Sequence, residues 1–132
     1  MNKLLIFLIV IIAASCTAGG GYEKAENAQD AGREFIRASL DGDYQKARFY
    51  LLQDTTNALL IEKQQRNYEQ LNNQEKRARR ESSIQPLSIQ PVNDSSTTYR
   101  YINSYNPRDT TTITIVKQNG DWLVDLKSIL SR

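Results

Sequence analysis

The sequence predicts a small α+β domain in which helices pack on a four-stranded antiparallel sheet. Two observations carry this prediction. Residues 23–79 repeat apolar side chains at the spacing of amphipathic helices. Residues 83–130 are rich in Ile, Val, Thr and Tyr, with proline and Asn-Gly between the apolar runs, as in strands joined by turns. A group of helices followed by a group of strands is typical of an α+β fold.

The first two helices are expected at residues 23–40 and 44–53. In the first helix, apolar residues recur every three to five positions and form a single stripe. Gly42 is suited to end this helix, because glycine accepts the left-handed conformation that often follows a last helical turn. Asp43 is suited to begin the next helix, because its side chain can accept hydrogen bonds from the free N–H groups of a first turn.

A third helix is expected from Asp54, Thr55 or Thr56 to about Arg79. Its first half carries apolar residues, whereas its second half is polar on every side and should project into solvent or fray. The basic residues of the run EKRARRE, residues 75–81, could contact anionic headgroups, but the interspersed glutamates favour a solvated helix end. The residues expected to cover the sheet are Phe35, Ile36, Leu40, Tyr50, Leu51 and Leu59.

The last two strands are expected to form a hairpin around Asn119-Gly120, a preferred pair for a two-residue type I′ turn. Hydrophobic alternation on both sides of this turn agrees with it. Together they predict the cross-strand pairs Lys117–Trp122, Ile115–Val124 and Ile113–Leu126. Because a slip of one residue would move every apolar side chain to the other face, this register is well specified.

The two earlier strands carry prolines and tyrosines. Pro86 and Pro91 suit an edge strand, because proline has no N–H to donate to a neighbouring strand. In the next strand, Tyr99, Tyr101 and Tyr105 share a face. Tyrosine combines an apolar ring with a polar tip, so these three residues are the candidates for contact with a ligand in a pocket or on the sheet. The same residues also suit an ordinary core or sheet surface.

The N-terminus has the features of a secretory signal peptide, predicted for residues 1–15. Lys3 precedes eleven apolar residues, and small residues lead up to Cys16. The apolar run is too short to cross a bilayer, which takes roughly 20 residues of helix. Cys16 is the only cysteine in the chain, and it stands where the apolar run ends.

The stretch Ala13-Ala14-Ser15-Cys16 resembles the lipobox of bacterial lipoproteins. This resemblance implies that the signal is removed and that Cys16 is acylated, so that the membrane is a partner of the protein. Residues 16–22 would then be a lipidated, flexible tether before a single domain of residues 23–132. The alternative is ordinary secretion, which would leave an odd free thiol. The stretch after Cys16 lacks the acidic run that resembles surface-export signals, so we expect the periplasmic face of the outer membrane.

The composition excludes several kinds of chemistry. The chain has no histidine, and its one cysteine is assigned to the anchor. This excludes Ser-His-Asp and Cys-His catalysis and zinc sites built from His or Cys. With 17 Lys and Arg against 15 Asp and Glu, charge gives no reason to expect a nucleic-acid partner. No metal, cofactor or enzymatic activity is expected.

The order of these segments resembles small lipoproteins of unknown function from Bacteroidetes with a nuclear transport factor 2-like, or cystatin-like, domain. The resemblance lies in Phe35, the junction DGDYQKA from Asp41 to Ala47, and the hairpin KQNGDWLVD from Lys117 to Asp125. It implies a curved sheet with the helices on its concave side, often with a cone-shaped pocket. Related enzymes use Asp and His in that pocket, and this chain has no histidine.

These observations give one leading hypothesis and two alternatives. The leading hypothesis is a lipid-anchored cell-envelope protein with a non-catalytic domain that binds a small ligand or an envelope protein. The first alternative is a histidine-free hydrolase or isomerase, which a deep pocket with a buried carboxylate beside tyrosine would favour. The second is a structural accessory of an envelope complex, which a completely filled core would favour.

Overall fold

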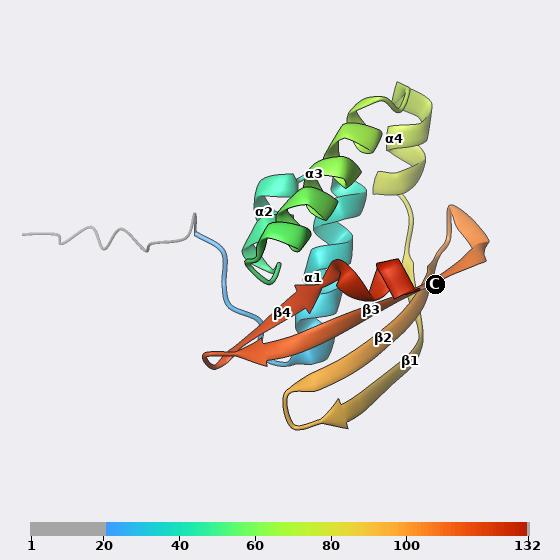
Figure 1. The fold of residues 1–132 in the computed structure, drawn as a ribbon. Helices are drawn as coiled ribbons and strands as arrows, with labels where there is room; N and C mark the ends of the chain where they lie inside the picture. Colours follow the sequence, from blue (N-terminus) through green and yellow to red (C-terminus); the bar gives the residue numbers. More distant parts are fainter. Residues whose placement is uncertain (1–20, 132) are drawn as a thin grey trace, which may run out of the picture.

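Four helices, four strands and a short 3₁₀ helix follow one another in the computed structural model, which describes residues 21–131 (Figure 1). The predicted signal peptide, Cys16 and most of the tether lie outside the described residues. The helices are α1 (Ala28–Asp41), α2 (Tyr44–Phe49), α3 (Thr55–Glu69) and α4 (Asn73–Arg80). The strands are β1 (Ile84–Asn93), β2 (Ser96–Asn103), β3 (Asn106–Gln118) and β4 (Asp121–Asp125), and the 3₁₀ helix is Leu126–Ser131.

The four strands form one antiparallel sheet, as the sequence predicted, and they lie in the order β1-β2-β3-β4. The strand with Pro86 and Pro91 is β1, at one edge of the sheet. This confirms the prediction that the two prolines lie on an edge strand. The register between β1 and β2 shifts immediately after each proline. The helices cover one face of this sheet, and α1 lies against it (Figure 1).

The hairpin between β3 and β4 has the predicted turn and most of the predicted register. Asn119 and Gly120 have φ of 51° and 81°, as a type I′ turn requires. The pairs Lys117–Trp122 and Ile115–Val124 are present. The third predicted pair, Ile113–Leu126, is wrong, because pairing stops at Thr114–Asp125. Leu126 begins the 3₁₀ helix instead, and its N–H donates to Asn57 Oδ1 at 2.8 Å.

Two helix boundaries differ from the prediction. The first helix begins at Ala28, five residues later than expected, because the Asn27 side chain caps it by accepting a hydrogen bond from the N–H of Asp30. The second helix ends at Phe49, because the chain after it runs along β4. There the N–H of Leu52 donates to the carbonyl of Val124 at 2.8 Å. Gly42 and Asp43 have the predicted roles of stop and cap.

The predicted third helix is two helices. The first, α3, ends at Glu69, and α4 begins at Asn73 after a short turn. Asn72 starts α4 with a capping box, in which its side chain accepts from the N–H of Glu75 and the Glu75 carboxylate accepts from the N–H of Asn72. The chain therefore reverses at the point where the apolar residues of the predicted helix run out.

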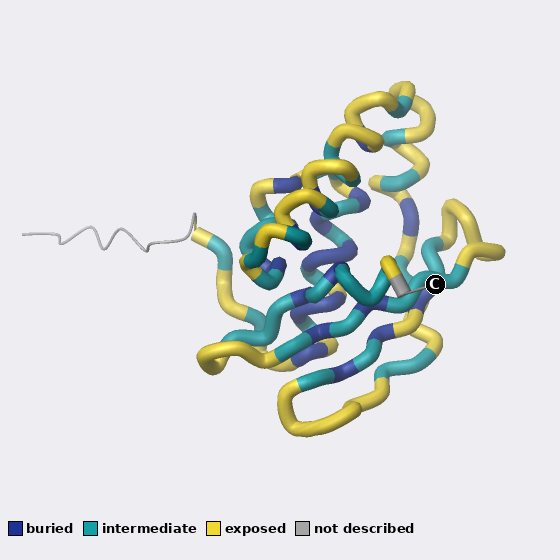
Figure 2. Tube along the Cα trace, in the orientation of Figure 1, coloured by how far each residue is buried: buried dark blue, intermediate teal, exposed yellow. Residues whose placement is uncertain are grey.

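The core lies between α1 and the inner face of the sheet (Figure 2). Ile113, Ile115 and Val124 supply the sheet side, each no more than 1% exposed. Gly32 lets α1 approach closely, because a Cβ there would lie 3.0 Å from the ring of Tyr99. Leu59 is the exception among the predicted core residues: it is 62% exposed on the outer side of α3. The other five predicted covering residues are buried.

Candidate ligand pocket

A pocket of about 300 Å³ opens between the helices and the inner face of the sheet. Apolar side chains, all but one of them buried, form its floor, and polar side chains, most of them partly exposed, form its walls and rim. The floor consists of Phe35, Ile36, Leu40, Ile113, Leu126 and Ile129. The walls and rim consist of Ser39, Tyr44, Gln64, Asn67, Arg79, Tyr101, Asn103, Tyr105 and Thr111. We call this site the helix–sheet pocket.

The three tyrosines singled out in the sequence have different positions. Tyr101 and Tyr105 line the helix–sheet pocket, whereas Tyr99 does not. Tyr99 is 1% exposed in the core, with its ring edge-on to that of Tyr101 at 5.8 Å between centroids. Burial raises the pKa of the Tyr99 hydroxyl. Tyr105 lies beyond the end of β2 and is 40% exposed at the rim.

Arg79 is the one charged side chain among the described residues that line the pocket. Its guanidinium carbon lies 5.1 Å from the centre of the Tyr105 ring, within range of a cation–π contact. It forms no ion pair with a carboxylate in residues 21–131. The sequence placed Arg79 in a solvated helix end, and its partly buried position at the pocket was not foreseen.

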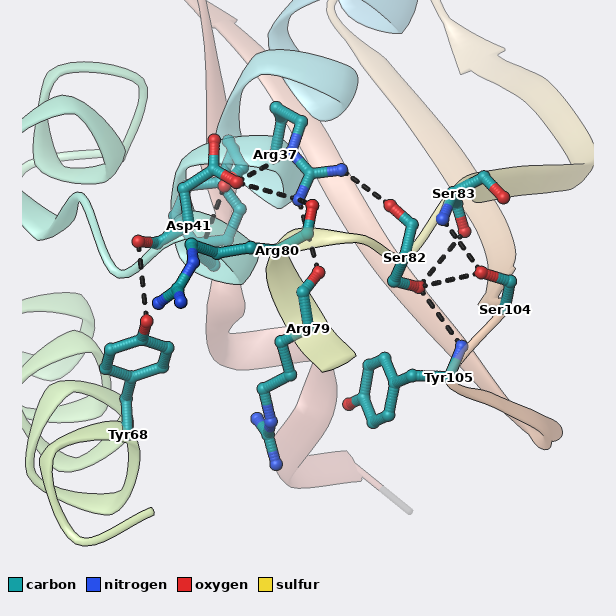
Figure 3. A network of polar contacts seen from close by, with 11 residues as sticks. Arg37, Asp41, Tyr68, Arg79, Arg80, Ser82, Ser83, Ser104 and Tyr105 are labelled. Carbon is teal, nitrogen blue, oxygen red and sulfur yellow. Dashed lines mark hydrogen bonds and ion pairs between the residues drawn. The ribbon is translucent and has the colours of Figure 1, made fainter. Parts of the chain in front are cut away.

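Arg37 of α1 fixes the end of α4, and with it the position of Arg79 (Figure 3). Its Nη1 donates to the carbonyl of Ser82 at 2.7 Å, and its Nη2 donates to the carbonyls of Arg80 and Arg79 at 3.0 and 3.2 Å. The Arg79 and Arg80 carbonyls belong to the last turn of α4, whose carbonyls have no partner further along the helix, and Ser82 directly follows the C-cap residue. Asp41 Oδ1 accepts from Arg37 Nη2 at 2.8 Å and holds the guanidinium in place.

Two serines join the start of β1 to the turn between β2 and β3 (Figure 3). The buried Ser82 Oγ accepts from the N–H of Tyr105 at 3.1 Å and lies 3.2 Å from Ser104 Oγ. Ser104 Oγ also accepts from the N–H of Ser83 at 2.8 Å. Since Ser82 is also bound to Arg37, one network holds Arg79 from one side and the backbone of Tyr105 from the other.

Tyr44 supplies a neutral hydrogen-bonding group on the pocket wall. It is the first residue of α2, and its hydroxyl donates to the carbonyl of Gln64 at 3.3 Å. Burial raises the pKa of this hydroxyl to about 12. At neutral pH, Tyr44 is therefore uncharged and can donate or accept a hydrogen bond, but it is a poor base.

Asn103 contributes an unusual polar atom to the pocket wall. Its Oδ1 is shielded from solvent and has no hydrogen-bond partner among the described residues. A buried acceptor without a donor costs about 1–3 kcal/mol. Asn103 is also the last residue of β2, where the register with β3 shifts. Asn103 was not singled out in the sequence as a site residue, and nothing in its local pattern marks it.

A separate polar cluster links α3 to the C-terminal end of β4, outside the pocket. The buried Asn57 amide donates to Asp54 Oδ2 and Asp125 Oδ1, both at 3.1 Å. Lys127 Nζ binds both carboxylates. Asp125 pairs with Thr114 in the hairpin, and this partly buried cluster, which the sequence did not reveal, satisfies its carboxylate.

The pocket is chemically suited to bind and orient a small molecule. Its lining within the described residues offers one cation and several neutral donors and acceptors, but no carboxylate, lysine or thiol. No three acidic or thiol side chains lie together as a metal site in residues 21–131. None of the helices in that part of the chain is long and apolar enough to cross a membrane.

Comparison with known proteins gives the fold a name. No protein-family model matches the chain, and no curated protein matches it significantly. A crystal structure at 2.00 Å resolution, of a Campylobacter jejuni protein named as a candidate NTF2-like transpeptidase, superposes on it with a TM-score of 0.54. The two chains are 18% identical, and the match covers 74% of this chain and 96% of the other. At this identity the likeness shows the fold alone: the chain adopts an NTF2-like α+β fold.

Proposed function

We propose that this protein is a lipid-anchored component of the bacterial cell envelope whose NTF2-like domain binds a small ligand in the helix–sheet pocket without changing it chemically. The observation that carries the proposal is the pocket itself. It combines a buried apolar floor with a rim of fixed polar groups, which is the usual construction of a small-molecule site.

The pocket supports ligand binding over a purely structural role. A domain that served only as a structural accessory would be expected to fill its core, since empty volume is destabilising. Here about 300 Å³ stays open between the helices and the inner face of the sheet. The network around Arg37 fixes both rim residues, Arg79 and Tyr105, beside this space.

The lining residues also support binding over catalysis. The name of the Campylobacter jejuni protein suggests acyl transfer between amides, which needs a nucleophile activated by a base. In this chain Ser39, a hydroxyl at the pocket, donates to the carbonyl of Phe35 at 3.0 Å instead. The pKa of Tyr44, about 12, is too high for that residue to serve as the base at neutral pH. We therefore propose no reaction for the pocket.

Membrane attachment through Cys16 is supported by the sequence of the N-terminus. If residues 1–15 are removed, acyl chains on Cys16 would hold the protein at the bilayer, because each buried methylene contributes roughly 0.8 kcal/mol. Thr17 to Gly21 would separate the anchor from the folded domain. Mass spectrometry of the membrane fraction tests this directly. We expect a chain that starts at an acylated Cys16, and a Cys16→Ser variant that leaves the membrane fraction. Unmodified, soluble wild-type protein would contradict the anchor.

A pocket-filling substitution tests the binding site. We expect the neutral probe hexanamide to bind the full-length protein in phosphatidylcholine nanodiscs, as measured by saturation-transfer NMR with empty nanodiscs as the blank. Thr111→Trp places an indole in the pocket and should weaken binding at least about tenfold, since excluding two methylene groups already costs that much. Thr112→Trp is the matched control, because the next residue of β3 faces the opposite side of the sheet. Equal binding by both variants would contradict the proposed site.

A further inference from the structure

We propose that the ligand of the helix–sheet pocket is a small monocarboxylate with an apolar body, and that its carboxylate binds the guanidinium of Arg79. This inference rests on the proposed function, because it names the chemical class of the ligand for the same pocket. Three features favour this ligand: the charge of the pocket, the shape of the guanidinium and the apolar floor.

The pocket has one positive charge and nothing within its described lining to neutralise it. Arg79 pairs with no carboxylate in residues 21–131. Glu69 is near enough to Tyr44 to affect its pKa, but it is exposed and does not line the pocket. A partly buried cation without a partner is stabilised by an anion. A ligand with one negative charge would balance the pocket, whereas a cationic ligand would be repelled.

The guanidinium and its single charge favour a carboxylate over a phosphate monoester. Its planar set of donors matches the two oxygens of a carboxylate in a paired arrangement. A phosphate monoester carries close to two negative charges at neutral pH, so one arginine would leave part of that charge unbalanced. The remaining polar groups of the rim, such as Tyr44, Gln64 and Thr111, are neutral.

The floor requires an apolar body on the ligand. Five of its six side chains are no more than 5% exposed, and they end in aliphatic or aromatic carbon. The pocket volume of about 300 Å³ is at the small end of the range for ligand sites, roughly 300–1,000 Å³. A short alkyl or aryl carboxylate therefore fits better than a lipid or a long peptide.

Arg79 is held ready for such a ligand, unlike the other arginines of α4. Arg37 fixes the carbonyl of Arg79, and the ring of Tyr105 lies beside its guanidinium. A side chain ordered before binding loses less conformational entropy on binding. Arg77 and Arg80 are exposed and do not line the pocket. Arg80 therefore offers a matched control with the same charge on the same helix.

Three probes with the same six-carbon chain test the proposal: hexanoate, hexanamide and hexyl phosphate. We would measure their affinities for the full-length protein in nanodiscs, for the wild type and for Arg79→Gln and Arg80→Gln. Hexanoate should bind the wild type at least about tenfold more tightly than hexanamide, which corresponds to about 1.4 kcal/mol. Arg79→Gln should remove this preference, and Arg80→Gln should keep it. Unchanged melting temperatures for both variants would show that they are folded.

Each remaining outcome contradicts either the ligand class or the binding function of the pocket. Equal affinity for hexanoate and hexanamide, or a preference that survives Arg79→Gln, would overturn the carboxylate assignment. Tighter binding of hexyl phosphate than of hexanoate would assign the pocket to phosphorylated ligands instead. If hexanamide binding is still lost in Thr111→Trp, the proposed pocket stands while the assignment of the ligand class falls. If no probe binds any of the proteins, both the pocket function and this inference fail.

Discussion

Two separate effects favour glycine at position 42, backbone conformation and packing, and each can be measured separately. Its φ of 75° lies in the left-handed region, where other residues are strained. A Cβ at this position would also lie 2.4 Å from the Tyr68 ring. Gly120 has a similar φ of 81° but has open space around it. The two glycines therefore differ in packing and not in backbone conformation.

We expect Gly42→Ala to destabilise the domain more than Gly120→Ala. Backbone strain alone should cost about 1 kcal/mol in Gly120→Ala, and overpacking against Tyr68 should add about 1–3 kcal/mol in Gly42→Ala. Urea unfolding followed by far-ultraviolet circular dichroism would give both free energies. Equal losses in the two variants would contradict the close contact between Gly42 and Tyr68.

Asp54 should make the stability of the domain depend on pH in the acid range. The N–H of Asn57 and the ammonium of Lys127 bind its carboxylate and lower its pKa below the ordinary value of 3.8. A carboxylate with a lowered pKa stabilises the folded state above the unfolded pKa, and this contribution is lost as pH falls through the folded pKa. The contribution is therefore complete near pH 7 and shrinks as pH falls below the ordinary pKa of 3.8.

The variant Asp54→Asn tests this dependence, because asparagine can still cap α3. It should be less stable than the wild type at pH 7, and the difference should shrink as pH falls from 7 to 2. Asp43→Asn is the control, because Asp43 caps α2 without an ion pair among the described residues. Its effect should be smaller and should change less with pH. A difference for Asp54→Asn that is the same at both pH values would contradict the role of the charge.

Single residues and residue pairs predicted the local structure where the signal spans only a few positions. Asn119-Gly120 predicted the turn, and Gly42 and Asp43 predicted the boundary between α1 and α2. The break before α4 also had such a signal, since Asn72 and Glu75 have the spacing of a capping box. That signal was overlooked because the surrounding residues are polar throughout, so no change in hydrophobic pattern marked the end of α3.

At the scale of elements, Arg37 is the link between α1 and the end of α4. Arg37→Lys should loosen that end, because a lysine ammonium has three donors at one point and does not reproduce the fork that serves three carbonyls. Hydrogen exchange should become at least about tenfold faster at the amides of Glu81 and Ser82, and hexanoate binding should weaken with it. Arg33→Lys, on the exposed side of the same helix, should change neither. Unchanged exchange in Arg37→Lys would show that α4 is held by other contacts.

Pairing between elements was predictable only where the connection is short. The register of β3 with β4 follows from a two-residue turn and hydrophobic alternation. The alternation continues to Leu126, however, while the strand stops at Asp125. The reason is Asn57, 69 residues away, which takes the N–H of Leu126. No local pattern reveals a hydrogen bond across that distance in the sequence.

At the scale of the whole molecule, the fold could be predicted from the sequence, but the pocket could not. The order of helices and strands, together with the resemblance to NTF2-like proteins, predicted the architecture that the structure shows. The helix–sheet pocket collects residues between positions 35 and 129 from the helices, the sheet and the 3₁₀ helix. Tyr101 and Tyr105 could be proposed because alternation in the sequence puts both on one face of the expected strand, although Tyr105 lies beyond the end of β2. Arg79 and Tyr44 reach the same space only through the packing of separate helices.

The central claim is that the helix–sheet pocket holds a carboxylate ligand. A crystal structure of the protein grown with hexanoate measures this most directly. We expect density for the carboxylate about 3 Å from the Arg79 guanidinium, with the alkyl chain against Phe35 and Ile113. Hexanoate bound elsewhere, or a pocket that contains only solvent at saturating hexanoate, would contradict the account.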